Sequence, residues 1–236
     1  MDLVVVGALP FLSARDNKPL YPPSPNPSMA QGRGLRTSTA EVKQLLIAWL
    51  ALTLGFTLLM TEPLQTGGGF DPDALVVTFF VAFVTAGAGF LLHELAHKVV
   101  AQKYGYWAEF RADYEMLAVT IASGAFGFLF AAPGAVEIRG QRIDARSNGV
   151  IALAGPATNV ALFVVFASLS FVAGGGLLSF VASFGAFINA FLAAFNMVPF
   201  GPLDGTKVFD WDKRVFGVAF AVCAALAAYS FFSFLG

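Results

Sequence analysis

Two histidines and a glutamate stand in one short segment, His93-Glu94-Leu95-Ala96-His97, and the chain contains no other histidine. On an α-helix, a spacing of four residues places both imidazoles on one face, about one turn apart, which suits two nitrogen ligands of a tetrahedral zinc ion. The glutamate between them lies close to the metal without having to bind it, so it can take a proton from a water molecule held there. The segment predicts a hydrolytic zinc site with His93 and His97 as ligands and Glu94 as the base.

The alternative is a pair of packed core histidines beside a glutamate that reaches toward the membrane surface. However, the motif lies in a long apolar segment. Ionisable side chains are costly in such a segment and mark functional sites by default. The context therefore favours metal chemistry over packing.

A catalytic zinc site needs a third protein ligand if one position is to stay open for water. Because there is no third histidine and only one cysteine, Cys223, in a late apolar run, a carboxylate is expected. Asp204 is the first candidate, since it lies in a segment broken by two prolines and two glycines. Asp210 and Asp212 remain alternative ligands, and Asp204 could instead cap a helix end.

The composition predicts an all-α polytopic membrane protein, because 57% of the 236 residues are hydrophobic and only 12% are charged. The formal net charge is -1 and no long basic run occurs, so nucleic acid is not an expected partner. Cys223 cannot form an internal disulfide and is expected to be an apolar filler.

Two domains are predicted, a Pro-rich flexible tail over residues 1–37 and a membrane domain over residues 38–236. Ser38 and Glu41 predict a capping box at the start of the first membrane helix. Loop charges place the tail on the cytoplasmic side by the positive-inside rule. Five spans are predicted, at about residues 41–60, 74–97, 149–173, 177–198 and 215–234.

The segment Met116 to Phe130 is apolar but short, and glycines interrupt it. A full crossing there would give six spans and would place the arginines that follow it outside. A re-entrant or surface element is therefore preferred, part helix and part strand, with a hairpin around Phe130 to Ile138. A solvated cytoplasmic patch is expected just before it, formed by Glu109, Asp113 and Glu115.

The loop charges also place the ends of the two motifs at one depth. His93 and His97 lie one to two turns before the cytoplasmic boundary, and Asp204 lies near the cytoplasmic end of a later helix. This agreement does not use the motifs themselves.

Three motifs together resemble the site-2 protease family of intramembrane zinc metalloproteases: HELAH, Gly-Pro-Ala-Thr-Asn at residues 155–159, and the NxxPxxPLDG run at residues 196–205. The likeness covers roughly Ser38 to the C-terminus. It implies a core of three membrane helices, one zinc ion per chain, and cleavage within the transmembrane segment of a membrane-anchored regulatory protein. It assigns His93, His97 and Asp204 as zinc ligands and Glu94 as the base.

The resemblance also concerns residues around the metal. Asn196 would face the site as a catalytic residue and hydrogen-bond the substrate backbone or the developing oxyanion, the alternative being a helix-packing amide. Asn159 is a candidate for supporting the metal ligands, or for packing helices together. The segment Gly127 to Ile138 resembles the strand by which such proteases hold an unwound substrate.

Two other functions fit part of the pattern. A metal transporter or sensor would bind zinc with the same residues and would not need Glu94, and a scaffold would bind other membrane proteins without zinc. For the protease, the expected partners are membrane-anchored substrates and the lipid bilayer, and a homo-oligomer is left open. No signal or transit segment is found, which fits a prokaryotic cell membrane with the N-terminus and the mouth of the site on the cytoplasmic side.

Overall fold

The computed structural model describes residues 35–61, 71–140 and 143–235. The predicted tail over residues 1–37 lies almost wholly outside the described residues, so its expected flexibility stays a prediction. The elements, in chain order, are α1 (Thr39–Thr61), α2 (Pro72–Ala82), the π-helical segment η2 (Phe83–Gly87), α3 (Ala88–Lys103), β1 (Trp107–Ala112), α4 (Tyr114–Ala125), β2 (Gly134–Arg139), α5 (Ala145–Val172), α6 (Gly176–Asn196), α7 (Asp204–Trp211) and α8 (Lys213–Leu235).

Five helices of the described chain are long and apolar enough to cross a membrane, which confirms the predicted class of a polytopic all-α membrane protein. They span Thr39–Thr61, Pro72–Lys103, Ala145–Val172, Gly176–Asn196 and Lys213–Phe234. The apolar segment after α3 forms only the 12-residue helix α4. Because a membrane crossing needs about 20 helical residues, α4 agrees with the preferred non-spanning element.

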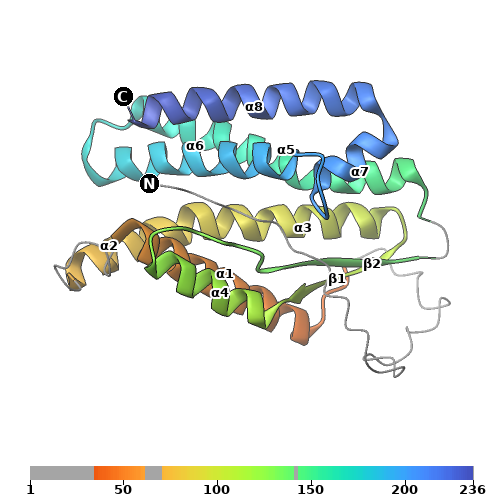
Figure 1. The fold of residues 1–236 in the computed structure, drawn as a ribbon, viewed down its shortest axis with the longest axis horizontal. Helices are drawn as coiled ribbons and strands as arrows, with labels where there is room; N and C mark the ends of the chain where they lie inside the picture. The colour runs from red at the N-terminus through yellow and green to blue at the C-terminus, as the bar shows by residue number, and fades with distance from the viewer. Residues whose placement is uncertain (1–34, 62–70, 141–142, 236) are drawn as a thin grey trace.

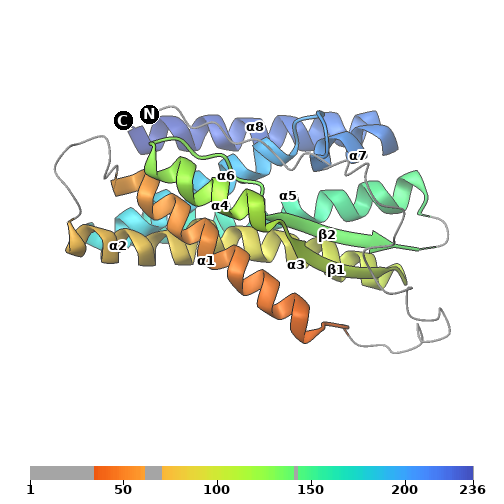
Figure 2. The same cartoon turned by 60° about the horizontal axis from the view of Figure 1, so that its bottom comes forward.

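Helix α3, which carries the HExxH motif, lies between two groups of elements (Figure 1). On one side are α5, α6, α7 and α8, and on the other are α1, α4 and the two strands. Figure 2 shows α1 crossing α3 obliquely. The motif helix therefore has neighbours on both sides that can supply partners for its polar side chains.

The two strands form an antiparallel sheet in which Trp107 pairs with Arg139 and Ala112 pairs with Gly134. The predicted hairpin around Phe130 to Ile138 is wrong. The strand pairs with β1 instead of with a neighbouring segment, and helix α4 stands between the two strands in the chain. The β element that was predicted to follow the HExxH helix is nevertheless present.

The start of α1 agrees with the predicted cap in one half only. The Ser38 hydroxyl accepts a hydrogen bond from the Glu41 backbone N–H at 3.0 Å, as a capping box requires. The Glu41 carboxylate does not bind the Ser38 backbone N–H, as the second half of a capping box would require. It is fully buried, bonded to Lys98 and to the backbone N–H of Phe110. A charged partner and a strand edge thus replace the local contact.

The predicted acidic patch is also wrong in part. Asp113 caps helix α4, since its carboxylate accepts a hydrogen bond from the Met116 N–H at 3.0 Å. Glu109 is half-buried in β1 and forms an ion pair with Arg111. Only Glu115 of the three is exposed. Local capping and strand formation leave the other two only partly exposed.

The π-helical segment η2 interrupts the second span, a feature that the sequence did not predict. Its Phe83 carbonyl accepts a hydrogen bond from the Trp49 indole N–H at 3.1 Å, and the two rings stack with centroids 4.2 Å apart. A π segment inserts an extra residue into the helical turn and so rotates everything that follows. The segment therefore sets which way α3 presents its polar side chains.

Helices α1 and α4 approach each other closely at Gly55 and Gly124. A methyl group built at Gly124 would overlap the Gly55 backbone. Small residues permit such close approach between membrane helices, where packing rather than the hydrophobic effect drives association. This contact holds α4 against α1, although α4 is too short to cross a membrane.

We expect Gly124→Ala to destabilise the protein by about 1–3 kcal/mol, because overpacking forces the two helices apart. Gly217→Ala in α8 is the matched control, since nothing lies within 4 Å of a methyl group at that position. The measurement is the thermal midpoint of the detergent-solubilised protein. Equal midpoints for the two variants would contradict the contact.

Candidate metal centre

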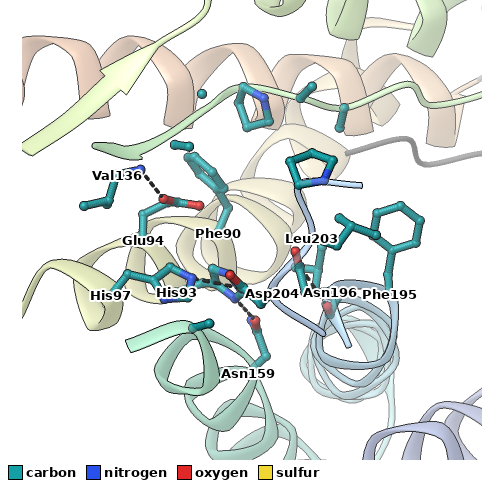
Figure 3. Close-up of a pocket in the computed structure, with 18 of the residues that line it drawn as sticks. Phe90, His93, Glu94, His97, Val136, Asn159, Phe195, Asn196, Leu203 and Asp204 are labelled. Atoms are coloured by element: carbon teal, nitrogen blue, oxygen red, sulfur yellow. Dashed lines mark hydrogen bonds and ion pairs between the residues drawn. The ribbon is translucent and has the colours of Figure 1, made fainter. Parts of the chain in front are cut away.

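Three side chains from two distant segments converge on one point. The Nε2 atoms of His93 and His97 lie 3.2 Å and 3.1 Å from Oδ2 of Asp204, and all three side chains are buried (Figure 3). Their candidate ligand atoms all lie within 4.8 Å of one another. Ligand atoms of a tetrahedral zinc ion lie about 3.3 Å apart when each is about 2.0–2.1 Å from the metal. The cluster therefore has dimensions that fit zinc.

The orientation of the two imidazoles also fits a cation. His93 Nδ1 lies 2.6 Å from the Asn159 side-chain oxygen, and His97 Nδ1 lies 2.7 Å from the Ile151 carbonyl oxygen. Because both partners are acceptors, each Nδ1 donates, and in a neutral ring Nε2 then carries a lone pair. Two lone pairs and a carboxylate facing one another repel unless a cation lies between them, so the donor set favours a bound metal.

Asn159 belongs to a buried amide network that spans three helices. Besides its contact with His93, it donates to the side-chain oxygen of Asn189 at 3.0 Å and to the Gly89 carbonyl at 3.3 Å. The Asn189 amide in turn donates to the Gly185 carbonyl at 2.9 Å. Asn159 was predicted as a supporting residue, whereas Asn189 was missed, although an asparagine within an apolar helix was itself a signal.

Asp204 reaches the cluster from the first residue of α7, a short helix that follows the proline-broken segment. Lys207, one turn later, donates to the other carboxylate oxygen at 3.3 Å. Oδ2 of the carboxylate thus faces the two imidazoles, while Oδ1 is bound to a cationic side chain.

Glu94 is buried beside the cluster but faces a different partner. Its Oε2 accepts a hydrogen bond from the Val136 N–H of β2 at 3.2 Å. In Figure 3, Glu94 and Asn159 lie on opposite sides of the cluster. The carboxylate thus lies between the metal cluster and the edge of the sheet.

The other predicted candidates have different positions. Asn196 lines the same cavity, and its amide donates to the Leu192 carbonyl of its own helix at 3.0 Å. Asp210 is exposed on α7, and Asp212 binds the backbone N–H of Arg214 at 2.7 Å at the start of α8. The structure therefore brings Asp204, and neither Asp210 nor Asp212, to the two histidines.

A cavity of about 170 Å³ surrounds the cluster. One wall consists of the approach to β2 and the strand itself, residues 131–136 and Ile138. Apolar side chains of α1, α3 and α6 form much of the rest, including Leu52, Phe56, Phe90, Leu192 and Phe195. The site thus offers a few polar groups within a largely apolar chamber, the form expected of a site for a substrate of mixed polarity.

An HExxH helix with a carboxylate from a second helix, set among five apolar helices, defines a membrane metalloprotease. A protein of Methanocaldococcus jannaschii named "Putative zinc metalloprotease MJ0611" is 41% identical over 185 residues, which cover 78% of this chain and 90% of that protein. A protein of Mycobacterium tuberculosis named "Putative zinc metalloprotease Rip3" is 32% identical over 147 residues, which cover 59% of this chain and 33% of that protein. The chain belongs to this family of zinc metalloproteases. No family model and no solved structure matches it.

We expect Gly155→Ala to lower the metal content of the purified protein. A methyl group there would lie 2.5 Å from Nε2 of both His93 and His97, so at least one imidazole must move. The measurement is bound zinc per chain by elemental analysis, with Gly217→Ala as the control. Full zinc content in Gly155→Ala would show that the two imidazoles do not hold the ion.

Proposed function

We propose that this chain is an intramembrane zinc endopeptidase of the site-2 protease type. It hydrolyses a peptide bond within or near the transmembrane segment of a membrane-anchored substrate. The observation that supports this most strongly is the place of the cluster, because His93 and His97 belong to a 32-residue apolar helix, Pro72–Lys103. Ionisable groups at such a position need a functional reason.

In this proposal His93, His97 and Asp204 would hold one zinc ion per chain. Zinc, when bound, would supply the positive charge that polarises the scissile carbonyl and acidifies an attacking water molecule. Glu94 takes a proton from this water molecule while the water oxygen attacks the carbonyl carbon. The same carboxyl then delivers the proton to the nitrogen of the leaving amine as the C–N bond breaks.

The supporting residues keep the ligands in place during these steps. Asn159 and the Ile151 carbonyl fix the ring orientation of the two histidines through Nδ1, which is the usual function of such contacts in metal sites. Lys207 occupies one oxygen of Asp204 and leaves the other for the metal. Asn196 lines the cavity and is proposed to hydrogen-bond the substrate backbone or the developing oxyanion.

The edge of β2 is the proposed binding place for the unwound substrate. Val136 lies in the register pair with Phe110, and its N–H points away from β1 toward Glu94. A substrate strand laid along this edge would place its backbone beside the metal cluster. The N-terminus and the mouth of the site are proposed to face the cytoplasm of a prokaryotic cell, and the substrates are proposed to be regulatory membrane proteins.

We expect Glu94→Gln to abolish cleavage of a single-span membrane peptide while retaining zinc, because the amide cannot accept the proton. A loss of at least about 100-fold is expected from removing the general base. The assay compares wild type, Glu94→Gln, Asp204→Asn and chelated wild type in detergent, with zinc content measured in parallel. Asp204→Asn should lose zinc and activity together, and added zinc should restore the chelated wild type.

The alternatives predict other results in this assay. Zinc bound by wild type and by Glu94→Gln, with equal function in both, would favour metal handling. Full cleavage after complete removal of zinc would contradict a metalloprotease.

Substrates with helix-breaking residues should be cut faster. A helical carbonyl is shielded by its own hydrogen bond, so the scissile segment must unwind before it can add to the edge of β2. A Gly-Pro pair near the scissile bond lowers helix stability by about 3–4 kcal/mol relative to two alanines, so a rate increase of at least about tenfold is expected. Peptides that differ only in this pair, compared by initial rates, test the expectation. Equal rates would show that unwinding does not limit cleavage.

A further inference from the structure

A buried ion pair outside the metal cluster joins α1 to α3. The Lys98 ammonium donates to Oε2 of Glu41, and the two side chains are 2% and 0% exposed. Lys98 also donates to the Thr37 hydroxyl at 2.8 Å. Two fully buried charges are costly to desolvate even when paired, so stability alone is a weak explanation for their presence.

The second oxygen of Glu41 holds the edge of the sheet. The Phe110 N–H of β1 donates to Glu41 Oε1 at 3.0 Å. Phe110 is the register partner of Val136, whose N–H donates to Oε2 of Glu94. Both N–H groups point away from the partner strand, as in the non-hydrogen-bonded pairs of antiparallel sheets. At one register position, therefore, a carboxylate binds each outer edge of the sheet.

Both carboxylates are tied to the same face of α3. Glu94 and Lys98 lie four residues apart on this helix and therefore one turn apart on one face. Helix α3 binds β2 directly through Glu94. It reaches β1 at Phe110 through the pair of Lys98 and Glu41, and at Ala108 directly, since the Gln102 amide donates to the Ala108 carbonyl at 3.1 Å. Figure 1 shows the sheet beside the C-terminal part of α3. The Phe110 ring adds a contact, since its centroid lies 5.9 Å from that of Phe90 on α3.

We propose that Glu41 and Lys98 are positioning residues, which set the place of the β2 edge relative to Glu94 and the metal. The inference rests on the proposed function, because it assigns them to substrate placement in that site. The metal ligands are oriented by separate contacts, from Asn159 and the Ile151 carbonyl. Loss of the ion pair should therefore move the sheet without removing zinc.

Three variants separate the charge from the hydrogen bond. Glu41→Gln retains an oxygen for the Phe110 N–H but leaves the buried Lys98 without a counter-charge. Lys98→Gln leaves the buried Glu41 carboxylate without a counter-charge but keeps the hydrogen bond between Glu41 and the Phe110 N–H. The double variant Glu41→Gln/Lys98→Gln removes both charges and lets two amides pair. Glu137→Gln is the matched control, because Glu137 forms an ion pair with Arg139 on the same sheet, at 2.9 Å, in which both side chains are more than a third exposed.

The first measurement is kinetic, with zinc content determined on each sample of the full chain in detergent. In each single variant we expect KM for the membrane peptide to rise about tenfold, the size expected when a buried charged group loses its partner. The kcat should stay within about twofold, since the reacting groups are unchanged. The double variant should recover most of the loss, and Glu137→Gln should match wild type.

The second measurement does not require cleavage. Hydrogen exchange should become faster in both strands, residues 107–112 and 134–139, in the two single variants, and should stay unchanged in the segment of α5 around Asn159. If wild type cuts no peptide, the proposed function fails, while the exchange rates still decide whether the pair holds the sheet.

Three results would overturn the positioning role. The first is unchanged KM and unchanged exchange in the single variants. The second is a loss of zinc in proportion to activity, which indicates a general structural role. The third is a double variant that is as impaired as the two single losses combined.

Discussion

The polar side chains of α3 must find partners inside an apolar bundle, and this requirement arranges the rest of the molecule. A bilayer offers no water to hydrogen-bond them, so each unsatisfied group would cost several kcal/mol. The polar groups on α3 contact four other elements, α1, α5, α7 and β2. The pairs are His93 with Asn159 of α5, His97 with the Ile151 carbonyl of α5 and with Asp204 of α7, Glu94 with Val136 of β2, and Lys98 with Glu41 of α1.

The same requirement explains why irregular backbone gathers around this helix. The chain is not helical between the end of α6 at Asn196 and the start of α7 at Asp204, whose side chain contacts both histidines. Gly155 leaves the space into which both imidazoles project. At the edge of the two-stranded sheet, the Val136 N–H donates a hydrogen bond to the Glu94 carboxylate. Each departure from regular helix lies next to a polar group or the cavity, where irregular backbone is tolerated in membrane proteins.

Two sets of buried polar contacts surround α3, one made of neutral amides and one of a charged pair. The amides of Asn159 and Asn189 hold His93 by neutral hydrogen bonds, which are modest individually but lie in a dry interior where an unpaired group is costly. The charged pair of Lys98 and Glu41 lies farther from the cluster, toward the sheet. In the proposed function, metal binding depends on the first set of contacts and substrate placement on the second, and both sets include residues of α3.

The sequence by itself determined the class, the five long apolar helices, the non-spanning segment after α3, the HExxH face and a carboxylate as the candidate third ligand. These follow from periodicity, length and local chemistry, which depend on neighbouring residues in the chain. Only the tertiary structure decided the pairing of β1 with β2 across α4, the contact of Glu41 with Lys98 in place of its cap, and the π segment. It also brought Asp204, which the family resemblance had already indicated, to the two histidines. Those contacts join residues far apart in the chain, so they depend on how packed helices place side chains, and no local pattern records that placement.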